Sequence, residues 1–206
     1  SPDPRTVNAL SLLWGVGVTL LGKPLTLQVE TAGGAPHYLN GQIIRFELVG
    51  RELLNSEYYV YRATLRPSLW YLTQSRDNRI FQNKSAVDII KQVLGTYSFA
   101  VEYNLTESYR DWEYCVQYQE SDFDFVSRLM EHEGIYYWFR HENGEHTLVL
   151  TDDVSTHEPA PGYDTYTFYD GQMHMLAHEE FVSDWHVQAQ ITPGGYATVD
   201  YDFRKP

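Results

Sequence analysis

The strongest constraint on the fold is a change of hydrophobic period in the middle of the chain. In KSAVDIIKQVLGTY (84–97) and ESDFDFVSRLMEHEG (120–134), the apolar residues recur at helical spacing and fall on one stripe. The segments FAVEY, YCVQY and IYYWF instead have the alternation or the aromatic content that is typical of strands. The sequence therefore predicts two helices set among strands, which is an α+β unit.

Both predicted helices begin with the same four-residue pattern. Ser85 is followed three positions later by Asp88, and Ser121 is followed in the same way by Asp124. A serine at this position accepts a backbone N–H of the first turn, and the acidic residue returns a hydrogen bond, as in a capping box. We therefore expect the helices to start directly after Ser85 and Ser121.

Glycines mark the predicted ends of these elements. Gly95 and Gly134 lie where a left-handed residue commonly ends a helix. Asn143-Gly144 is a strong hairpin signal between the aromatic strand IYYWF and the returning strand TLVLTD. The central part of the chain is thus predicted to contain two helices, several strands and one hairpin.

The residues before this unit have the pattern of strands. PLTLQVE alternates, NGQIIRFELVG follows the turn-prone pair Asn40-Gly41, and YYVYRATLRP stops at Pro67. Three such strands joined by short turns suggest a small barrel or sandwich. The apolar stretch at 9–22 is too short to span a membrane as a helix, and we interpret it as an interior strand and loop. Strand-like alternation returns at 181–203.

Charge and cysteine content exclude several classes of function. The formal net charge is −13, and a field of that sign repels phosphate backbones, so general nucleic-acid binding is not expected. A single cysteine, Cys115, excludes an internal disulfide framework and a multi-cysteine metal site. Because Cys115 lies in the alternating segment EYCVQY, we interpret it as a buried core thiol.

Three neighbouring acids could form a catalytic pair. Glu120, Asp122 and Asp124 supply the carboxylates that glycoside hydrolysis requires, provided that two of them face each other across a cleft. The alternative is structural, because Asp124 belongs to the capping pattern and first-turn acids are favoured by the helix dipole. We favour the structural interpretation and predict no catalytic residue.

The histidines give only a weak metal-binding pattern. His174 and His178 have a four-residue spacing, with Glu179 and Glu180 following, but HMLAH lacks the glutamate of an H-E-x-x-H motif. His132 lies near the predicted end of a helix, where the dipole favours an imidazolium, and a structural role is expected. There is also no P-loop, no G-x-G-x-x-G and no G-x-S-x-G elbow, so we expect no metal and no cofactor.

Two aromatic clusters, LWYL (69–72) and YYWF (136–139), have two interpretations. They could form a stacking platform for a sugar or a base. Alternating aromatics in strands more often form core contacts and cross-strand pairs. We favour a role in the core or in a protein interface.

Long stretches of the chain resemble a known family. LRPSLWYLTQSRDNRIFQNKSAVDII and YCVQYQESDFDFVSRLMEHEGIYYWFRHENGEHTLVLTDD are similar to the VgrG spike proteins of bacterial type VI secretion, as are LLGKPLTLQVE and DYDFRKP. The resemblance implies a mainly β, α+β fold of the phage tail-hub type. Residues 1–67 would be strands of a first hub β-barrel, residues 68–153 an α+β insertion domain, and residues 154–206 a linker and strands that begin a second barrel.

The resemblance also implies a mechanical function and not an enzymatic one. In this family three copies form a hub on a hexameric tube of Hcp protein, and the spike carries effector or adaptor proteins. Assembly would take place in the bacterial cytoplasm, followed by injection through the secretion machine, with no membrane-spanning segment. We expect this chain alone to be monomeric or weakly trimeric.

Two alternatives remain open from the sequence. A tail-hub or baseplate protein of a contractile phage or phage-like particle belongs to the same mechanical class. A carbohydrate-active enzyme or a sugar-binding module belongs to another class. Two facing carboxylates in a cleft would favour the enzyme, whereas an exposed aromatic stripe without acids would favour the binding module.

Overall fold

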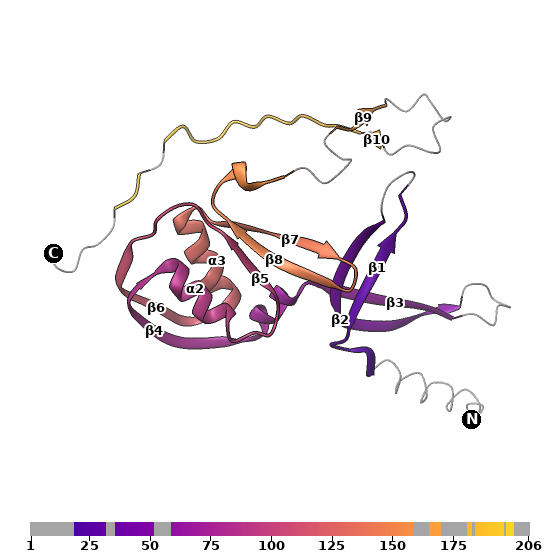
Figure 1. Cartoon of the computed structure of the whole chain (residues 1–206), viewed down its shortest axis with the longest axis horizontal. Helices are drawn as coiled ribbons and strands as arrows, with labels where there is room; N and C mark the ends of the chain where they lie inside the picture. The colour runs from indigo at the N-terminus through magenta and orange to yellow at the C-terminus, as the bar shows by residue number, and fades with distance from the viewer. Residues whose placement is uncertain are drawn as a thin grey trace.

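A computed structural model describes most of the chain and is mainly β with few helices, in agreement with the expected class (Figure 1). The described residues are 19–31, 36–51, 59–158, 165–169, 181–182, 184–195 and 197–199. The strands, α-helices and 3-10 helices (η) are β1 Pro24–Val29, β2 His37–Arg51, β3 Tyr59–Arg66, η1 Ser68–Gln74, β4 Arg76–Ser85, α2 Ala86–Leu94, β5 Val101–Asn104, β6 Asp111–Ser121, α3 Asp122–Glu133, β7 Tyr136–Glu142, β8 Glu145–Thr151, η2 Val154–Thr156, β9 Thr167–Phe168 and β10 Phe181–Val182.

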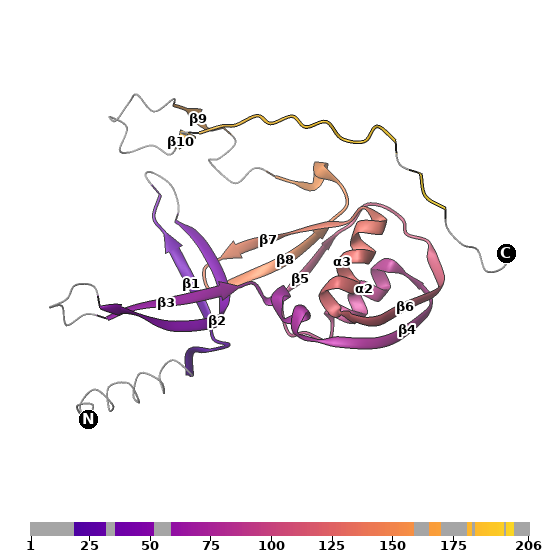
Figure 2. The same ribbon diagram turned by 180° about the vertical axis from the view of Figure 1, so that it is seen from behind.

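The elements from η1 to β8 form the α+β unit, which contains the main hydrophobic core. β4 pairs antiparallel with β6, and a second sheet has the order β5-β8-β7, with β5 parallel to β8. Both helices lie inside the curve of the β4–β6 ribbon, as Figures 1 and 2 show from opposite sides. Their apolar stripes meet residues of the strands; for example, Phe125 of α3 stacks on Phe81 of β4 with ring centroids 5.6 Å apart. Cys115 of β6 belongs to this core, as the sequence predicted, and burial raises the pKa of its thiol.

The two helix starts have the same geometry. The Ser85 hydroxyl accepts from the Asp88 backbone N–H (3.1 Å) and donates to the Asp88 carboxylate (2.7 Å). At the start of α3, Ser121 makes the same two contacts with Asp124, at 3.0 and 2.7 Å. The return bond therefore runs between the two side chains, and each pair of residues satisfies one orphan N–H of its helix.

The two helix ends differ from each other, and the prediction for Gly95 was wrong. Gly134 has φ +74°, and the backbone N–H of Ile135 donates to Met130 O (2.8 Å), which closes α3. Gly95 is right-handed, with φ −64°. α2 ends through Thr96, whose N–H and hydroxyl both donate to Val93 O, and through Tyr97, whose N–H donates to Leu94 O, so the last two carbonyls are satisfied without a left-handed residue.

β7 and β8 form a hairpin with a two-residue loop, hereafter the hairpin. Glu142 pairs with Glu145, and Asn143 and Gly144 make the connection. Gly144 has φ +96°, whereas Asn143 does not have a positive φ. The loop is therefore not a type I′ turn, which would need positive φ at both positions.

β1, β2 and β3 form a three-stranded antiparallel sheet, hereafter the N-terminal sheet. Asn40 and Gly41 were expected at a turn but lie inside β2, opposite Thr26 and Leu25. Gly41 instead permits close packing, since a Cβ there would lie 2.9 Å from Arg66 O. Among the described residues the three strands form an open sheet with β1 and β3 at its edges, so the expected barrel closure is not present in this part of the chain.

Near both ends of the chain, the described residues of this single copy do not form the strands that the sequence pattern indicated. Residues 184–195 and 197–199 form no strand, although β9 and β10 make a short parallel pair just before them. An extended segment becomes a strand only when a neighbour satisfies its backbone groups, and no described strand lies against this one.

Within 9–22, residues 9–18 lie outside the described part, and Thr19 and Leu20 are helical. No helix in the described ranges is long and apolar enough to cross a membrane.

Replacing Gly134 should destabilise the fold through backbone conformation alone. A Cβ at Gly134 would meet nothing within 4 Å, so the cost of Gly134→Ala or Gly134→Val comes from the left-handed backbone, about 1–2 kcal/mol. Gly134→Asn should cost less, because asparagine tolerates this conformation. Gly50→Ala is the control, since that position is also open but has no positive φ. A denaturant midpoint equal to that of wild type for Gly134→Val would contradict the prediction.

Candidate assembly surface

The three candidate acids do not form a catalytic pair. Asp124 is held by the Ser121 cap, and Glu120 binds Arg128, with Oε1 2.6 Å from Nη2. Asp124 and Glu131 line an open groove of about 510 Å³ between α3 and the start of β7. Because both acids lie on α3, they form one wall of this groove and do not face each other across it.

Asp122 has a different role from the one its position suggested. Its side chain is buried, with 4% of the residue exposed, and its carboxylate accepts from Gln117 Nε2 and Tyr97 Oη, both at 2.8 Å, and from Arg79 Nη2. The pKa of Asp122 lies below its usual value. Desolvation by burial raises this pKa, but the hydrogen bonds from Gln117, Arg79 and Tyr97 together lower it by more. Asp122 is therefore a buried carboxylate that joins α3 to β4, to β6 and to the turn after α2.

The histidine candidates give no metal centre in the described part of the chain. His132 lies in the last turn of α3, edge-on to Trp112 with ring centroids 4.9 Å apart, and Arg110 Nη2 is 3.4 Å from its Nε2. His174, His178, Glu179 and Glu180 lie outside the described residues. Within the described ranges, no group of three or more His, Cys, Asp or Glu side chains could hold a metal ion.

The aromatic clusters contribute mostly to the core. Leu69 and Leu72 of η1 are buried, and Tyr137 and Phe139 of β7 pack against the core cluster. On the other face of β7, Tyr136 donates or accepts a 2.8 Å hydrogen bond with Nε2 of His157 and stacks on its ring. This pairing ties the segment after β8 to the hairpin.

The N-terminal sheet has one polar face and one apolar face. The polar face carries Arg45, Glu47 and Arg62, which form ion pairs of 2.7 and 3.2 Å. The strand register places a row of apolar side chains on the opposite face. Their exposed fractions run from 36% for Leu25 to 53% for Leu39, and the row consists of Leu25, Leu27, Val29, Leu39, Leu48, Tyr59 and Tyr61. We call this row the apolar sheet face.

Partly exposed apolar rows of this kind are typical of surfaces that associate with other proteins. A sheet normally buries its apolar face against another layer, and large exposed apolar patches mark protein interaction sites. The sequence predicted the strands but not their pairing, so the row could not be located from the sequence. The alternation of PLTLQVE was the signal that pointed to one of its three strands.

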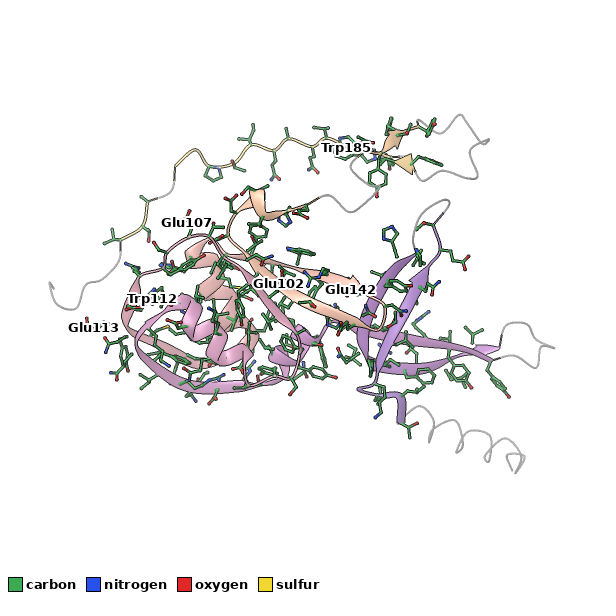
Figure 3. All side chains as sticks on the ribbon, in the orientation of Figure 1. Glu102, Glu107, Trp112, Glu113, Glu142 and Trp185 are labelled. Atoms are coloured by element: carbon green, nitrogen blue, oxygen red, sulfur yellow. The ribbon has the colours of Figure 1, made fainter. Side chains whose placement is uncertain are left out.

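The hairpin fixes the N-terminal sheet to the α+β unit. β3 pairs with β2 only as far as Gln42, and the hairpin tip occupies the edge of β2 beyond that point. There the Asn40 side-chain amide donates to Glu142 O (2.7 Å) and Glu145 O (2.5 Å). Figure 3 labels Glu142 at this tip, next to β2. The sheet is thus held at one edge, and the row on its apolar face stays partly exposed, although Ile43 on the same face is buried.

Comparison with known proteins identifies the family. The family model for the phage tail baseplate hub matches residues 16–206. The chain belongs to the phage tail baseplate hub family. Two Pseudomonas aeruginosa relatives, the type VI secretion system spike proteins VgrG1c and VgrG1a, are 46% and 45% identical to this hub chain over 188 residues, or 91% of its length. The chain spans 25% and 29% of the length of those two relatives.

A solved structure supports the same assignment for this hub chain. The Escherichia coli c3393 protein is described as a component of the type VI secretion system with structural similarity to the T4 bacteriophage tail proteins gp27 and gp5. It matches with a TM-score of 0.60 and 26% identity, over 73% of this chain and 40% of that one. A more distant relative, the Vibrio cholerae actin cross-linking toxin VgrG1, is 31% identical over 155 residues, or 71% of this chain and 13% of the toxin.

Asp122→Ala should destabilise the hub chain far more than an exposed substitution beside the same arginine. Removing one partner of a buried charged network costs about 3–5 kcal/mol, because Arg79 Nη2 and Tyr97 Oη lose the carboxylate that they bind. Asp77→Ala is the matched control: its carboxylate also contacts Arg79, at 3.2 Å, but its side chain is 54% exposed. We expect the control to change the free energy of unfolding by less than about 1 kcal/mol. Equal effects of the two substitutions in urea unfolding would contradict the assigned role of Asp122.

Proposed function

We propose that this chain is the hub segment of a type VI secretion spike, a trimeric tip on the Hcp tube that punctures membranes and carries effectors. The observation that carries the proposal is the open apolar sheet face in a chain that is about 45% identical to spike proteins. A mechanical hub needs large permanent contacts between copies, and obligate contacts of this kind are apolar. The proposal assigns the apolar sheet face to those contacts.

In this proposal the domain limits follow the predicted ones. Residues 1–67 contribute strands of a first barrel that includes the N-terminal sheet, residues 68–153 pack outside it as the α+β unit, and residues 154–206 return to the barrels. The exposed segment 184–195 supports the last step. Its side chains Trp185, Val187 and Ile191 alternate with polar residues and are 73%, 87% and 98% exposed (Figure 3). This pattern is typical of a strand that pairs only in the assembled hub.

The proposed role is mechanical, with no catalytic residue and no cofactor in this chain. Three copies would form the hub, a hexameric Hcp tube would bind one end, and effector or adaptor proteins would travel with the spike. Assembly would occur in the bacterial cytoplasm before export through the machine. The chain alone would be monomeric or weakly trimeric, since each copy brings a net charge of −13.

A hub protein of a contractile phage or phage-like particle is the second candidate. The description of the matching family and the likeness of the c3393 protein to phage tail proteins support it. The two candidates share the same trimeric geometry and differ in the segment that the polypeptide carries beyond the hub. A needle encoded in the same polypeptide would favour the secretion spike.

A chimera tests the proposed function. This chain would replace the matching 188 residues of the P. aeruginosa VgrG1c spike, and trimer formation and secretion would be measured. The chimera should form a trimer, whereas Leu27→Asp should lower the trimer yield and secretion by at least about tenfold, because an unpaired carboxylate is costly in an apolar contact. The matched control is Ile80→Asp, an equally apolar strand residue that is 62% exposed on β4, outside the apolar sheet face. A chimera that folds but stays monomeric would contradict the proposal, as would equal loss in both variants.

A further inference from the structure

Two histidines hold the junction between the N-terminal sheet and the hairpin. They are His141 on β7 and His146 on β8, which are cross-strand partners with ring centroids 5.8 Å apart. The backbone N–H of Asn40 donates to Nδ1 of His141 (3.0 Å), and the backbone N–H of Ser68 donates to Nε2 of His146 (3.0 Å). The two histidines therefore bind the two chain segments that separate where β3 leaves β2.

The chemistry of these bonds fixes the protonation of both rings. A backbone N–H can only donate, so the ring nitrogen opposite it must carry a lone pair and no proton. His141 is then the Nε2–H tautomer and His146 the Nδ1–H tautomer. An imidazolium has a proton on both nitrogens, so protonating either ring replaces an acceptor by a donor that faces another donor.

We propose that His141 and His146 form a pH-sensitive latch, which holds the N-terminal sheet on the hairpin while both rings are neutral and releases it when they are protonated. Release would free the Asn40 and Ser68 amides. It would also weaken the adjacent bonds from the Asn40 side chain to the hairpin carbonyls, because all of these contacts share one small junction. The latch goes beyond the proposed function and does not depend on it.

The groups around the two rings favour the neutral state. β1, β2, η1 and the loop before β5 present uncharged residues to the junction: Pro24, Thr26, Asn40, Gln42, Ser68, Ser98, Phe99 and Ala100. Phe139 contacts both rings, with centroids 6.3 and 5.7 Å away. Arg66 at the end of β3 is exposed.

The hairpin itself supplies the remaining charged groups near the latch. Arg140 Nη2 binds Glu102 at 2.7 Å, and Arg140 Nε binds Glu142 at 3.3 Å. The Glu142 side chain is 61% exposed, and Glu145 is exposed as well. Within the described part of the chain, the ion pairs of Glu142 do not include either histidine, so this carboxylate offers little compensation for an imidazolium in the half-buried junction.

The pH range in which the latch opens follows from the direction in which the pKa values of His141 and His146 are shifted. Burial lowers the pKa of His141, and burial together with nearby His141 lowers the pKa of His146. The unfolded chain has histidine pKa values of about 6.5, so below that pH the unfolded state binds more protons than the folded state. The latch is therefore complete above about pH 6.5 and is lost as the pH falls through the lower folded values.

The test combines one measurement on the wild-type chain with one variant. Nitrogen-15 NMR at about pH 7.5 should show the Nε2–H tautomer for His141 and the Nδ1–H tautomer for His146. Between about pH 7.5 and 5, the protection factors of the Asn40 and Ser68 amides should fall by about tenfold or more, because protonation removes the ring acceptor of each amide. The double variant His141→Asn/His146→Gln keeps an acceptor near each position but cannot titrate, so its protection factors should change by less than about twofold over the same range.

His186→Gln is the control. It removes a histidine whose side chain is 87% exposed, and the variant should keep the wild-type pH response. Opposite tautomers in the wild-type chain would overturn the proposal without any variant. So would a double variant that folds and retains the wild-type loss of amide protection at low pH.

Discussion

The buried carboxylate of Asp122 is the interaction on which the arrangement of the α+β unit depends. It binds Arg79 of β4, Gln117 of β6 and Tyr97, which lies just after α2, and Asp122 itself begins α3. A buried charge is tolerated only when such partners surround it, so the network constrains the relative placement of β4, β6, α3 and the turn after α2. From Asp122, α3 runs to Glu133 and ends at Gly134, directly before the hairpin.

The hairpin connects the α+β unit to the N-terminal sheet. Its tip lies along the edge of β2 where β3 has ended. There, a backbone carbonyl of the hairpin and the two neutral histidines accept hydrogen bonds from Asn40 and Ser68, whose N–H groups would otherwise be unpaired. The sheet is held by a polar edge, which leaves its apolar face free for association. A rigid core, a polar junction and an open apolar face together suit a subunit whose function is to assemble.

The sequence predicted the features that depend on neighbours within a few residues. The serine caps, the left-handed Gly134 and the two-residue hairpin are local, and their residue types determine their geometry. The prediction for Gly95 was wrong because Thr96 and Tyr97 satisfy the last carbonyls of α2 without a left-handed residue. Asn40-Gly41 has the composition of a turn, but pairing with β1 and the close approach of Arg66 place it inside a strand.

Features that depend on strand register could not be predicted. Arg79 and Gln117 face Asp122 only because β4 and β6 pair in one particular register, and nothing in the local sequence marks that register. The same holds for the apolar sheet face and for the two histidines, whose partners at Asn40 and Ser68 lie 101 and 78 residues away along the chain. Of the strand-like alternation at 181–203, the described residues form only the short β10, because alternation does not supply a pairing partner.

The central claim is that the apolar sheet face is the surface through which the hub assembles. Electron cryomicroscopy of the trimeric particle formed by the VgrG1c chimera tests it most directly. The account predicts a three-fold hub in which Leu27 and Leu39 are buried against other strands, while Ile80 on the outer β4–β6 ribbon stays exposed. A three-fold hub in which Leu27 and Leu39 face solvent would contradict it.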